Sequence, residues 1–454
     1  MRRRYPAPPV AGARAARREA PRAGEATGLR SRSVRALVFG VDPGFTPPER
    51  DLADGTPEGR LLQGLATTPM ALQEVPDPSL LGDDWVVLSS RLTGICGSDT
   101  KQVFMDMGDS GDASDFSMTA FISFPQVLGH EVVADVVEVG PDAGDLEVGQ
   151  RVLLQCWLSC GPRGITPECP ACANGDYSLC WSFTEGRLTP GIHSGNSSDA
   201  TGGFAELLPA HRSMAIPVPD DVPDEVAVLA DPFAVSLHSI TRNPPPPGGR
   251  ALVWGAGALG TCAIAILRSL YPDVDVAAVV RHPAQQELAR RLGAHVLDSV
   301  LDDEALVVGL AEWSGGNLHQ PWEGLPITHP GHIDVCYDTI ASPKTIELAL
   351  RVISERGTIS LSGVHAAGRF EWSPWYFKEA RIVGSNAFGI EEVGGVRKHA
   401  IEHYLDLVQA GRVDVSAMLT HTFRLDEWRD AFETLAKQHD TGAIKVAFDF
   451  REAT

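Results

Sequence analysis

The sequence lacks any apolar run long enough to span a membrane, and it lacks the apolar stretch of a secretory signal peptide. It also lacks an excess of positive charge, because 38 Lys and Arg residues stand against 59 Asp and Glu residues, a formal net charge of -21. Such a charge opposes broad contact with nucleic acid or anionic lipid, since neither would release counterions. We therefore expect a small molecule as the partner, with no nucleic acid and no membrane.

Cysteine is scarce outside one stretch of the chain. Five of the eight cysteines lie between Cys156 and Cys180. Clustered cysteines without a secretory signal predict a reduced, cytoplasmic protein in which the thiols bind metal rather than form disulfides.

The first 34 residues have no hydrophobic periodicity and are rich in Arg, Ala and Pro. This composition predicts a disordered extension. A transit peptide is the alternative, but Glu19, Glu25 and several prolines oppose the amphipathic helix that it needs.

Two patterns divide the rest of the 454 residues, a length that favours two domains. Residues 35–235 hold short apolar runs separated by turn residues, which predict an antiparallel or barrel-like β domain. Strands and helices alternate over 236–367, as in a parallel, doubly wound sheet. The tail 368–454 ends in another strand. We expect an α/β protein in which the second domain interrupts the first.

A glycine-rich turn follows the apolar run 251–254 and precedes a helix expected over 258–270. Gly255 permits a tight turn, Gly257 lets a pyrophosphate approach the backbone, and Gly260 allows close helix packing. Many glycine turns bind nothing, but the strand, turn and helix context favours a dinucleotide.

The second strand of this domain ends without the acidic residue that binds the ribose of NAD. Arg281 occupies that place, and an arginine there can bind the 2′-phosphate of NADP. A solvated Arg281 at a strand end is the alternative. The sequence thus favours NADP over NAD.

Four cysteines have the spacing C-x8-C-x2-C-x7-C within a stretch rich in Gly and Pro: Cys160, Cys169, Cys172 and Cys180. Four thiolates on one loop suit a structural, tetrahedral zinc ion, which would also stabilise the loop. Free buried cysteines are the alternative. A nucleic-acid zinc ribbon usually has a second C-x2-C pair and a basic face, and both are missing here. Cys156 is a spare candidate for the first ligand.

A second set of ligands lies upstream of these cysteines. Cys96 follows a predicted strand, and His130 with Glu131 begins another. A thiolate, an imidazole and a carboxylate leave zinc with an open fourth position, as a catalytic site requires. Separately, His130 would more often be structural and Cys96 a small buried hydrophobe.

The chain resembles the zinc-containing medium-chain dehydrogenase/reductase family, nearest to its polyol and threonine dehydrogenase branch. The resemblance covers residues 35–450 and rests on these motifs in order: GICGSD (94–99), GHE (129–131), the four cysteines, GGFAE (202–206), ADPFAVSLH (230–238), GAGALG (255–260) and FKEARIVGS (377–385). It implies a GroES-like catalytic domain, a Rossmann nucleotide domain, one catalytic and one structural zinc, and a homodimer or homotetramer.

The resemblance also implies residue roles. Cys96 and His130 would bind the catalytic zinc, and Asp231 stands where this branch usually has a glutamate ligand. Glu131 would be an exchangeable ligand or a supporting group, and Asp99 would orient His130. Ser98 matches the hydroxyl that passes the alcohol proton outward. The implied cofactor contacts are Gly255, Gly257, Leu259, Gly260, Arg281, Gly363, Val364 and Lys445.

Three departures from the family pattern are visible. The insertion GPRGITPE separates Cys160 from Cys169, Lys101 replaces a frequent histidine two residues after Asp99, and Asp231 has a shorter arm than glutamate. The insertions 41–81, 103–124 and 313–332 are further candidates for specificity or subunit contacts.

The predicted chemistry is metal-assisted interconversion of a small alcohol or polyol with its aldehyde or ketone, with hydride exchanged with NAD(P). One alternative is a zinc-free enone or quinone reductase of the same fold, although such relatives generally lack both ligand sets. The other is a non-catalytic cofactor-binding scaffold, because fold alone does not establish activity.

Overall fold

The computed structural model describes residues 33–40, 56–106, 117–365 and 368–451. The predicted disordered extension lies outside these residues except for Ser33 and Val34, which begin a strand. Within the described part of the chain, every helix is too short or too polar to cross a bilayer.

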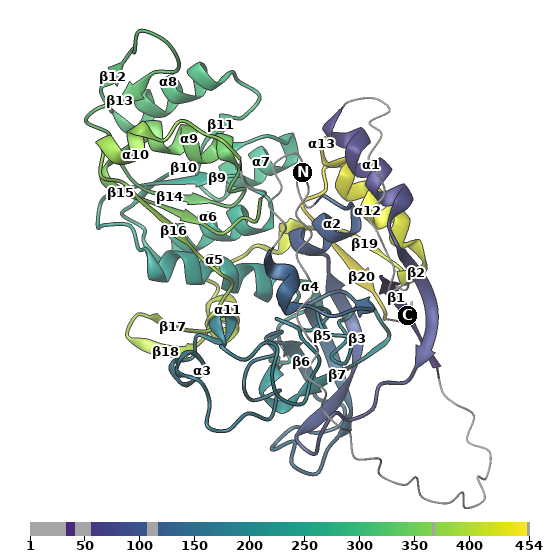
Figure 1. The fold of residues 1–454 in the computed structure, drawn as a ribbon. Coiled ribbons are helices and arrows are strands. Elements are labelled where there is room, and N and C mark those ends of the chain that lie inside the picture. Colours follow the sequence, from purple (N-terminus) through teal and green to yellow (C-terminus); the bar gives the residue numbers. More distant parts are fainter. Residues whose placement is uncertain (1–32, 41–55, 107–116, 366–367, 452–454) are drawn as a thin grey trace, which may run out of the picture. The chain divides into compact units, whose positions relative to one another are not determined.

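The first domain is built on two sheets (Figure 1). The larger contains β3 (Trp85–Gly94), β5 (Glu131–Val139), β6 (Arg151–Leu154), β7 (Leu207–His211), β8 (Ala215–Pro217), β19 (Leu419–Phe423) and β20 (Lys445–Asp449). The smaller contains β1 (Ser33–Phe39), β2 (Met70–Pro76) and β4 (Gln126–Val127). Most residues of β3 are buried, so this strand forms the centre of the β domain.

The second domain contains a six-stranded parallel sheet in the order β11-β10-β9-β14-β15-β16. The strands are β9 (Arg250–Trp254), β10 (Asp275–Val280), β11 (His295–Asp298), β14 (Ile333–Asp338), β15 (Ile353–Leu361) and β16 (Arg381–Gly384). This order is that of a doubly wound dinucleotide-binding sheet. The predicted α/β architecture is therefore confirmed.

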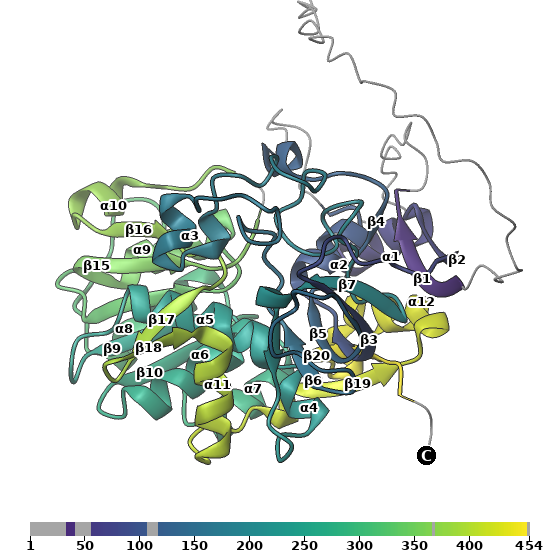
Figure 2. The same ribbon diagram turned by 90° about the horizontal axis from the view of Figure 1, so that it is seen from below.

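Helices cover both faces of the parallel sheet (Figures 1 and 2). The helices of this region are α5 (Ala230–Arg242), α6 (Ala258–Leu270), α7 (Pro283–Arg291), α8 (Asp303–Ser314), α9 (Pro343–Val352), α10 (Ser373–Phe377) and α11 (Ala400–Gln409). The apolar side chains of α6 enter one core cluster, and those of α8 and α9 enter another. The α6 helix has the bounds expected from its apolar pattern.

The chain returns to the first domain later than the expected boundary at residue 368. β16 pairs in parallel with β15, with Ile359 opposite Ile382, so residues up to Gly384 belong to the parallel sheet. β20 then pairs with β3 in the larger β sheet. An apolar run such as RIVG does not show by itself which of two sheets it joins.

The insertions contain structure that their composition did not indicate. The described part of 41–81 includes α1 (Pro57–Thr67), which packs against α12 (Trp428–Ala436). Residues 313–332 include the short pair β12 (Leu318–His319) and β13 (Ile327–Thr328). The remaining α-helices and strands are α2 (Gly97–Val103), α3 (Pro170–Asn174), α4 (Asp224–Ala227), α13 (Gln438–Thr441), β17 (Ile390–Val393) and β18 (Val396–His399).

Candidate active site

Antiparallel pairing of β3 with β5 brings the upstream ligands together. Gly94 lies opposite Glu131 in this pairing, so Cys96 just beyond β3 faces the residues that begin β5. One ligand atom from each of Cys96, His130 and Glu131 lies within 4.8 Å of the other two. His130 and Glu131 are buried, whereas Cys96 is partly exposed. The donor set is therefore sulfur, nitrogen and oxygen, and these three ligands would leave the fourth position of a tetrahedral zinc ion open.

Asp99 lies in the first turn of α2, directly behind these ligands. Its Oδ2 accepts a hydrogen bond from the backbone N–H of Cys96 at 2.9 Å, and its Oδ1 lies 3.7 Å from Nδ1 of His130. Burial raises the pKa of Asp99, and Glu131 adds to the rise. Burial alone would lower the pKa of His130, but Cys96, Asp99 and Asp231 raise it well above its usual value. The site thus favours a positive charge, as a bound cation would supply.

Asp231 lies in the first turn of α5 and is 6% exposed. Its oxygens fall outside the close group formed by Cys96, His130 and Glu131. Its Oδ2 is buried and has no hydrogen-bond partner among the described residues. Burial, aided by Glu131, raises the pKa of Asp231 to about 7. A buried, unpartnered carboxylate is costly unless a ligand or ion satisfies it.

Lys445 on β20 forms a buried ion pair with Glu131, and its Nζ also donates to the carbonyl of Ile95 at 3.0 Å. A β-carbon on Gly94 would collide with the carboxylate of Glu131 and press on the Lys445 side chain. Glycine at position 94 therefore makes room for this pair. The side chain of Lys445, expected to reach the cofactor phosphates, is directed at Glu131 in this structure.

Two further residues named from the sequence lie in α2, which begins directly after Cys96. Ser98, the expected proton carrier, is exposed two residues after Cys96. Lys101, at the place of the frequent histidine, donates a hydrogen bond to the carbonyl of Val364.

The downstream cysteines form a closed group, in which one sulfur from each of Cys160, Cys169, Cys172 and Cys180 lies within 4.8 Å of the others. The sulfurs of Cys160 and Cys180 are 3.7 Å apart, and no disulfide joins them. Zinc–sulfur bonds of about 2.3 Å in a tetrahedron put neighbouring sulfurs about 3.8 Å apart. The geometry of the four sulfurs thus fits zinc.

Backbone N–H groups also prepare these sulfurs for a metal. Trp181 and Cys172 donate to the sulfur of Cys169, each at 3.5 Å, and Ser182 donates to that of Cys180 at 3.4 Å. Burial would raise the pKa of Cys169, but these donors lower it. The side chain of Cys172 is the largest cause that lowers the pKa of Cys180 to about 6, whereas the pKa values of Cys160 and Cys172 themselves are raised. Such donors stabilise thiolates, the form that binds zinc.

The glycine turn has the geometry that its sequence suggested. Gly255 has a φ of +86°, and a β-carbon on Gly260 would collide with the carbonyl of Gly255. Gly257 has open space where its β-carbon would stand, and it caps the N-terminus of α6. This end of α6 is a suitable place for a phosphate.

The other expected cofactor contacts lie around the sheet. Arg281 is exposed at the end of β10, where it is free to meet a ligand. Gly363 lies against Ile340, and Val364 is 52% exposed. These positions surround the carboxyl ends of the strands, where doubly wound sheets bind nucleotides.

Helix α5 connects Asp231 with the glycine turn. Asp231 lies in its first turn, and the hydroxyl of Ser236, one and a half turns later, donates to the carbonyl of Leu259 at 2.8 Å. Cys262 on α6 is close enough to Lys445 and Glu131 for both to influence its pKa, which burial raises. The two predicted sites are thus neighbours in the fold.

Three residues outside the recognised motifs lie near one of the two ligand groups: Cys156 and His193 near the catalytic group, and Arg163 near the downstream cysteines. Cys156 is buried beside the catalytic group rather than among the four downstream sulfurs, and burial, Asp231 and Cys96 raise its pKa well above its usual value. His193 packs on the ring of His130 with ring centres 4.5 Å apart. Burial, reinforced by His130, lowers the pKa of His193 to about 3. Arg163 is buried in the insertion between the first two downstream cysteines.

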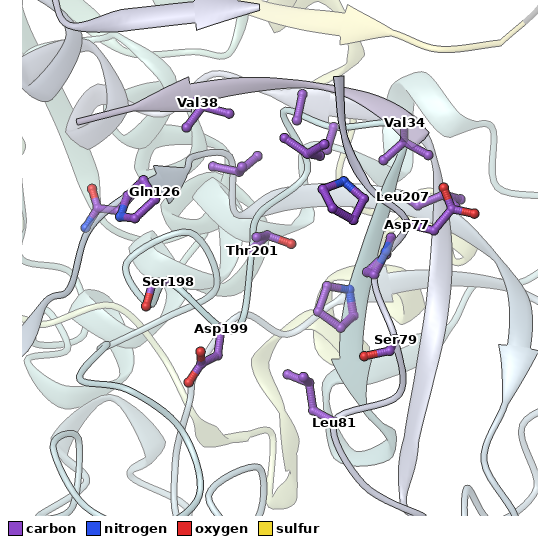
Figure 3. Close-up of a pocket in the computed structure, with 18 residues that line it drawn as sticks. Val34, Val38, Asp77, Ser79, Leu81, Gln126, Ser198, Asp199, Thr201 and Leu207 are labelled. Atoms are coloured by element: carbon purple, nitrogen blue, oxygen red, sulfur yellow. The ribbon is translucent and has the colours of Figure 1, made fainter. Parts of the chain in front are cut away.

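A cavity of about 370 Å³ lies elsewhere, with none of the predicted site residues in its wall (Figure 3). Val34 and Val38 of β1 line one side, and Ser198, Asp199 and Thr201 line another. Its wall is mainly apolar and contains no cluster of metal ligands. It contributes nothing to the chemistry of the two ligand groups.

The comparisons with known proteins agree with this geometry. The family model described as the alcohol dehydrogenase GroES-like domain matches residues 82–220, and that of the zinc-binding dehydrogenases matches residues 258–409. (R,R)-butanediol dehydrogenase of Saccharomyces cerevisiae is 27% identical over 388 residues, which cover 82% of this chain and 93% of that protein.

Solved structures share the fold. A putative zinc-binding dehydrogenase from Sinorhizobium meliloti, bound to NADP, has a TM-score of 0.64 at 22% identity and covers 92% of this chain and 99% of that one. Acetophenone reductase from Geotrichum candidum, in complex with NAD, has a TM-score of 0.64 at 20% identity. The match covers 93% of this chain and 98% of that one.

The GroES-like β domain, the doubly wound sheet and the two ligand groups define a class, the zinc-binding dehydrogenases. Within this class, the chain belongs to the zinc-containing medium-chain dehydrogenase/reductase family. It is an oxidoreductase of the alcohol dehydrogenase type, and the family prediction from its motifs is confirmed.

Proposed function

We propose that this enzyme interconverts a small alcohol or polyol with its aldehyde or ketone, using one catalytic zinc, one structural zinc and NAD(P). The observation that carries the proposal is the open group formed by Cys96, His130 and Glu131. Asp231 of α5 acts on the charge of His130, and Ser236 of the same helix contacts the glycine turn. Bound zinc would polarise the oxygen of the alcohol or carbonyl, and the nicotinamide would exchange the hydride.

The residues around this group have separate tasks in the proposal. Cys96 and His130 hold the metal, and either Glu131 or Asp231 provides the third ligand. Asp99 fixes Cys96 through the backbone and supports the imidazole of His130. Ser98, exposed beside Cys96, takes the hydroxyl proton toward solvent.

A substrate panel read at 340 nm with both NAD and NADP tests the proposal. We expect turnover of small diols and secondary alcohols that is lost with chelator and restored by zinc. Activity that a chelator leaves unchanged would support a zinc-free reductase instead. Cofactor binding without turnover of any alcohol or carbonyl would support a scaffold.

The same proposal includes a homodimer or homotetramer in the cytoplasm. Trp372, Trp375 and Tyr376 form an exposed aromatic stretch in and beside α10, which supports a subunit contact. All eight cysteines are free, which supports the proposed reducing compartment. Light scattering measures the oligomeric state directly.

Arg281 is proposed to bind the 2′-phosphate of NADP. Replacing it with alanine removes a charge-assisted contact, so we expect KM for NADP to rise about tenfold or more while KM for NAD stays within about twofold. Steady-state kinetics with each cofactor measure this. The exposed Arg291 is a matched control, and its alanine variant should leave both constants unchanged. Equal effects of Arg281→Ala on both cofactors would contradict the assignment.

Gly257 is proposed to leave room for the pyrophosphate. A β-carbon there meets no protein atom within 4 Å, so Gly257→Ala should fold with an unchanged melting temperature. It should nevertheless weaken cofactor binding by about tenfold, because the methyl group takes the space of the phosphate. Isothermal calorimetry and thermal unfolding separate the two effects. Wild-type affinity in a folded Gly257→Ala protein would exclude this place as the phosphate site.

A further inference from the structure

His193 brings a second imidazole to the metal ligands. It lies in the loop between the downstream cysteines and β7, and its ring packs on that of His130 at 4.5 Å with an angle of 49° between the planes. The side chain is only half-buried, so part of the ring is open to solvent. No motif of the family accounts for it.

The two nitrogens of His193 have different surroundings. Nδ1 lies 2.7 Å from the carbonyl oxygen of Ser194, which can only accept, so Nδ1 is the donor. Nε2 has no hydrogen-bond partner in the described part of the chain. In the neutral ring Nε2 carries a lone pair and can accept one hydrogen bond.

The backbone on both sides of His193 is fixed. Leu158 donates to the carbonyl of Ile192 at 3.0 Å, and Ser194 donates to that of Cys156 at 2.9 Å. These bonds form a bridge between Trp157 and His193, and the rings of these two residues meet edge to face at 6.0 Å. The backbone of His193 is therefore held by residues 156–158, which follow β6, and its ring is held by contact with Trp157.

Arg163 fixes the same loop from its other side. Its side chain is 1% exposed and donates five hydrogen bonds, all to backbone carbonyls. The acceptors are Leu158, Glu185, Leu188, Thr189 and Gly191, at distances between 2.7 and 3.2 Å. Because one guanidinium satisfies four carbonyls of residues 185–191, it holds the loop that ends at His193.

We propose that His193 is a specificity-determining residue that accepts a hydrogen bond from a second hydroxyl of the substrate, and that Arg163 is its positioning residue. The substrate class is then the vicinal diols and longer polyols. In this proposal, a hydroxyl on the carbon next to the reacting carbon would lie beside the ligands, and its acceptor would be the free Nε2 of the ring that packs on His130. This inference rests on the proposed alcohol dehydrogenase activity and names its substrate class.

The insertion between Cys160 and Cys169 gains a role from this proposal. It supplies Arg163, whereas a two-residue spacing between these cysteines would have no place for it. The longer loop therefore connects the structural metal lobe to the wall of the substrate site. Arg163 itself touches no candidate ligand and acts only through the loop.

The test compares 2,3-butanediol with 2-butanol, which share a carbon skeleton and a secondary carbinol and differ in one hydroxyl. His193→Phe keeps a ring that can pack on His130 but removes the acceptor. We expect kcat/KM for the diol to fall about tenfold, mostly through KM, and that for 2-butanol to change less than about threefold. His193→Gln restores an acceptor near the position of Nε2 and should recover most of the loss.

A binding measurement provides a readout without turnover. With cofactor present, the diol should raise the melting temperature of the wild-type holoenzyme more than 2-butanol does, and His193→Phe should remove this difference. Arg163→Lys keeps the positive charge, but a single ammonium group cannot donate to all five backbone carbonyls as the planar guanidinium does. It should show the same selective loss on the diol, with zinc content and the circular dichroism spectrum unchanged.

The outcomes separate this inference from the proposed function. A wild-type enzyme that turns over the two substrates, combined with an unchanged diol-to-alcohol ratio in His193→Phe, overturns the role of His193 and leaves the dehydrogenase intact. An unchanged ratio in Arg163→Lys overturns the positioning role. A wild-type enzyme inactive on every alcohol and carbonyl with either cofactor overturns the proposed function and this inference together.

Discussion

Cys96→Ala is expected to lower turnover on the order of 10³-fold and to remove one of the two proposed zinc ions per chain. The thiol is part of the open ligand group with His130 and Glu131, and no other sulfur belongs to that group in the described chain. Loss of a Lewis acid removes several kcal/mol of transition-state stabilisation, and each tenfold in rate corresponds to about 1.4 kcal/mol. Elemental analysis and steady-state kinetics on the same preparation measure both effects.

Cys336→Ala is the matched control for this experiment. Cys336 is equally a free cysteine, but it is buried within β14 among apolar residues of the parallel sheet. Its variant should keep two zinc ions and near wild-type turnover, with only a modest loss of stability from the small cavity. Full activity in Cys96→Ala, or retention of both ions, would remove Cys96 from the catalytic centre.

The sequence was most informative where spacing alone determines geometry. The C-x2-C pair Cys169 and Cys172 begins a short helix, and the nearby Cys160 and Cys180 complete the group without help from distant strands. The glycine turn is equally local, since Gly255 and Gly260 contact each other across one turn. Local motifs of this kind can be predicted because few chain conformations satisfy them.

The sequence was less informative where the outcome depends on which strands pair. Cys96 and His130 meet because β3 and β5 pair with Gly94 opposite Glu131, and no short-range pattern contains that register. The direction of Lys445 toward Glu131 likewise depends on the pairing of β20 with β3. The place of β16 in the parallel sheet likewise depends on a long-range pairing, that of β16 with β15.

His193 and Arg163 illustrate a further limit of the sequence. An arginine in an insertion is usually solvated, and a histidine in a polar loop is intermediate between buried and exposed. Only the fold shows that Arg163 is buried under five carbonyls and that His193 packs on His130.

Cys172→Ser is expected to release the structural zinc and to lower the melting temperature by at least about 5 °C. Cys172 is 3% exposed, and its sulfur lies within the closed group of four. The stretch it stabilises is short of other apolar contacts, since the local cluster consists mainly of the cysteines themselves. Zinc analysis and thermal unfolding measure the change, with Cys336→Ser as the matched buried cysteine.

The effect of losing this ion should extend beyond the lobe. The carbonyl of Gly175 accepts a hydrogen bond from Ile390 at 2.9 Å, Ser178 and Asn386 exchange two hydrogen bonds, and Asp176 pairs with Arg242 of α5 at 2.6 Å. Hydrogen exchange in Cys172→Ser should therefore accelerate both in 160–180 and in the hairpin 390–399, while β9 and β14 stay protected. Unchanged zinc content together with wild-type exchange in both segments would show that Cys172 is not a ligand of a structural ion.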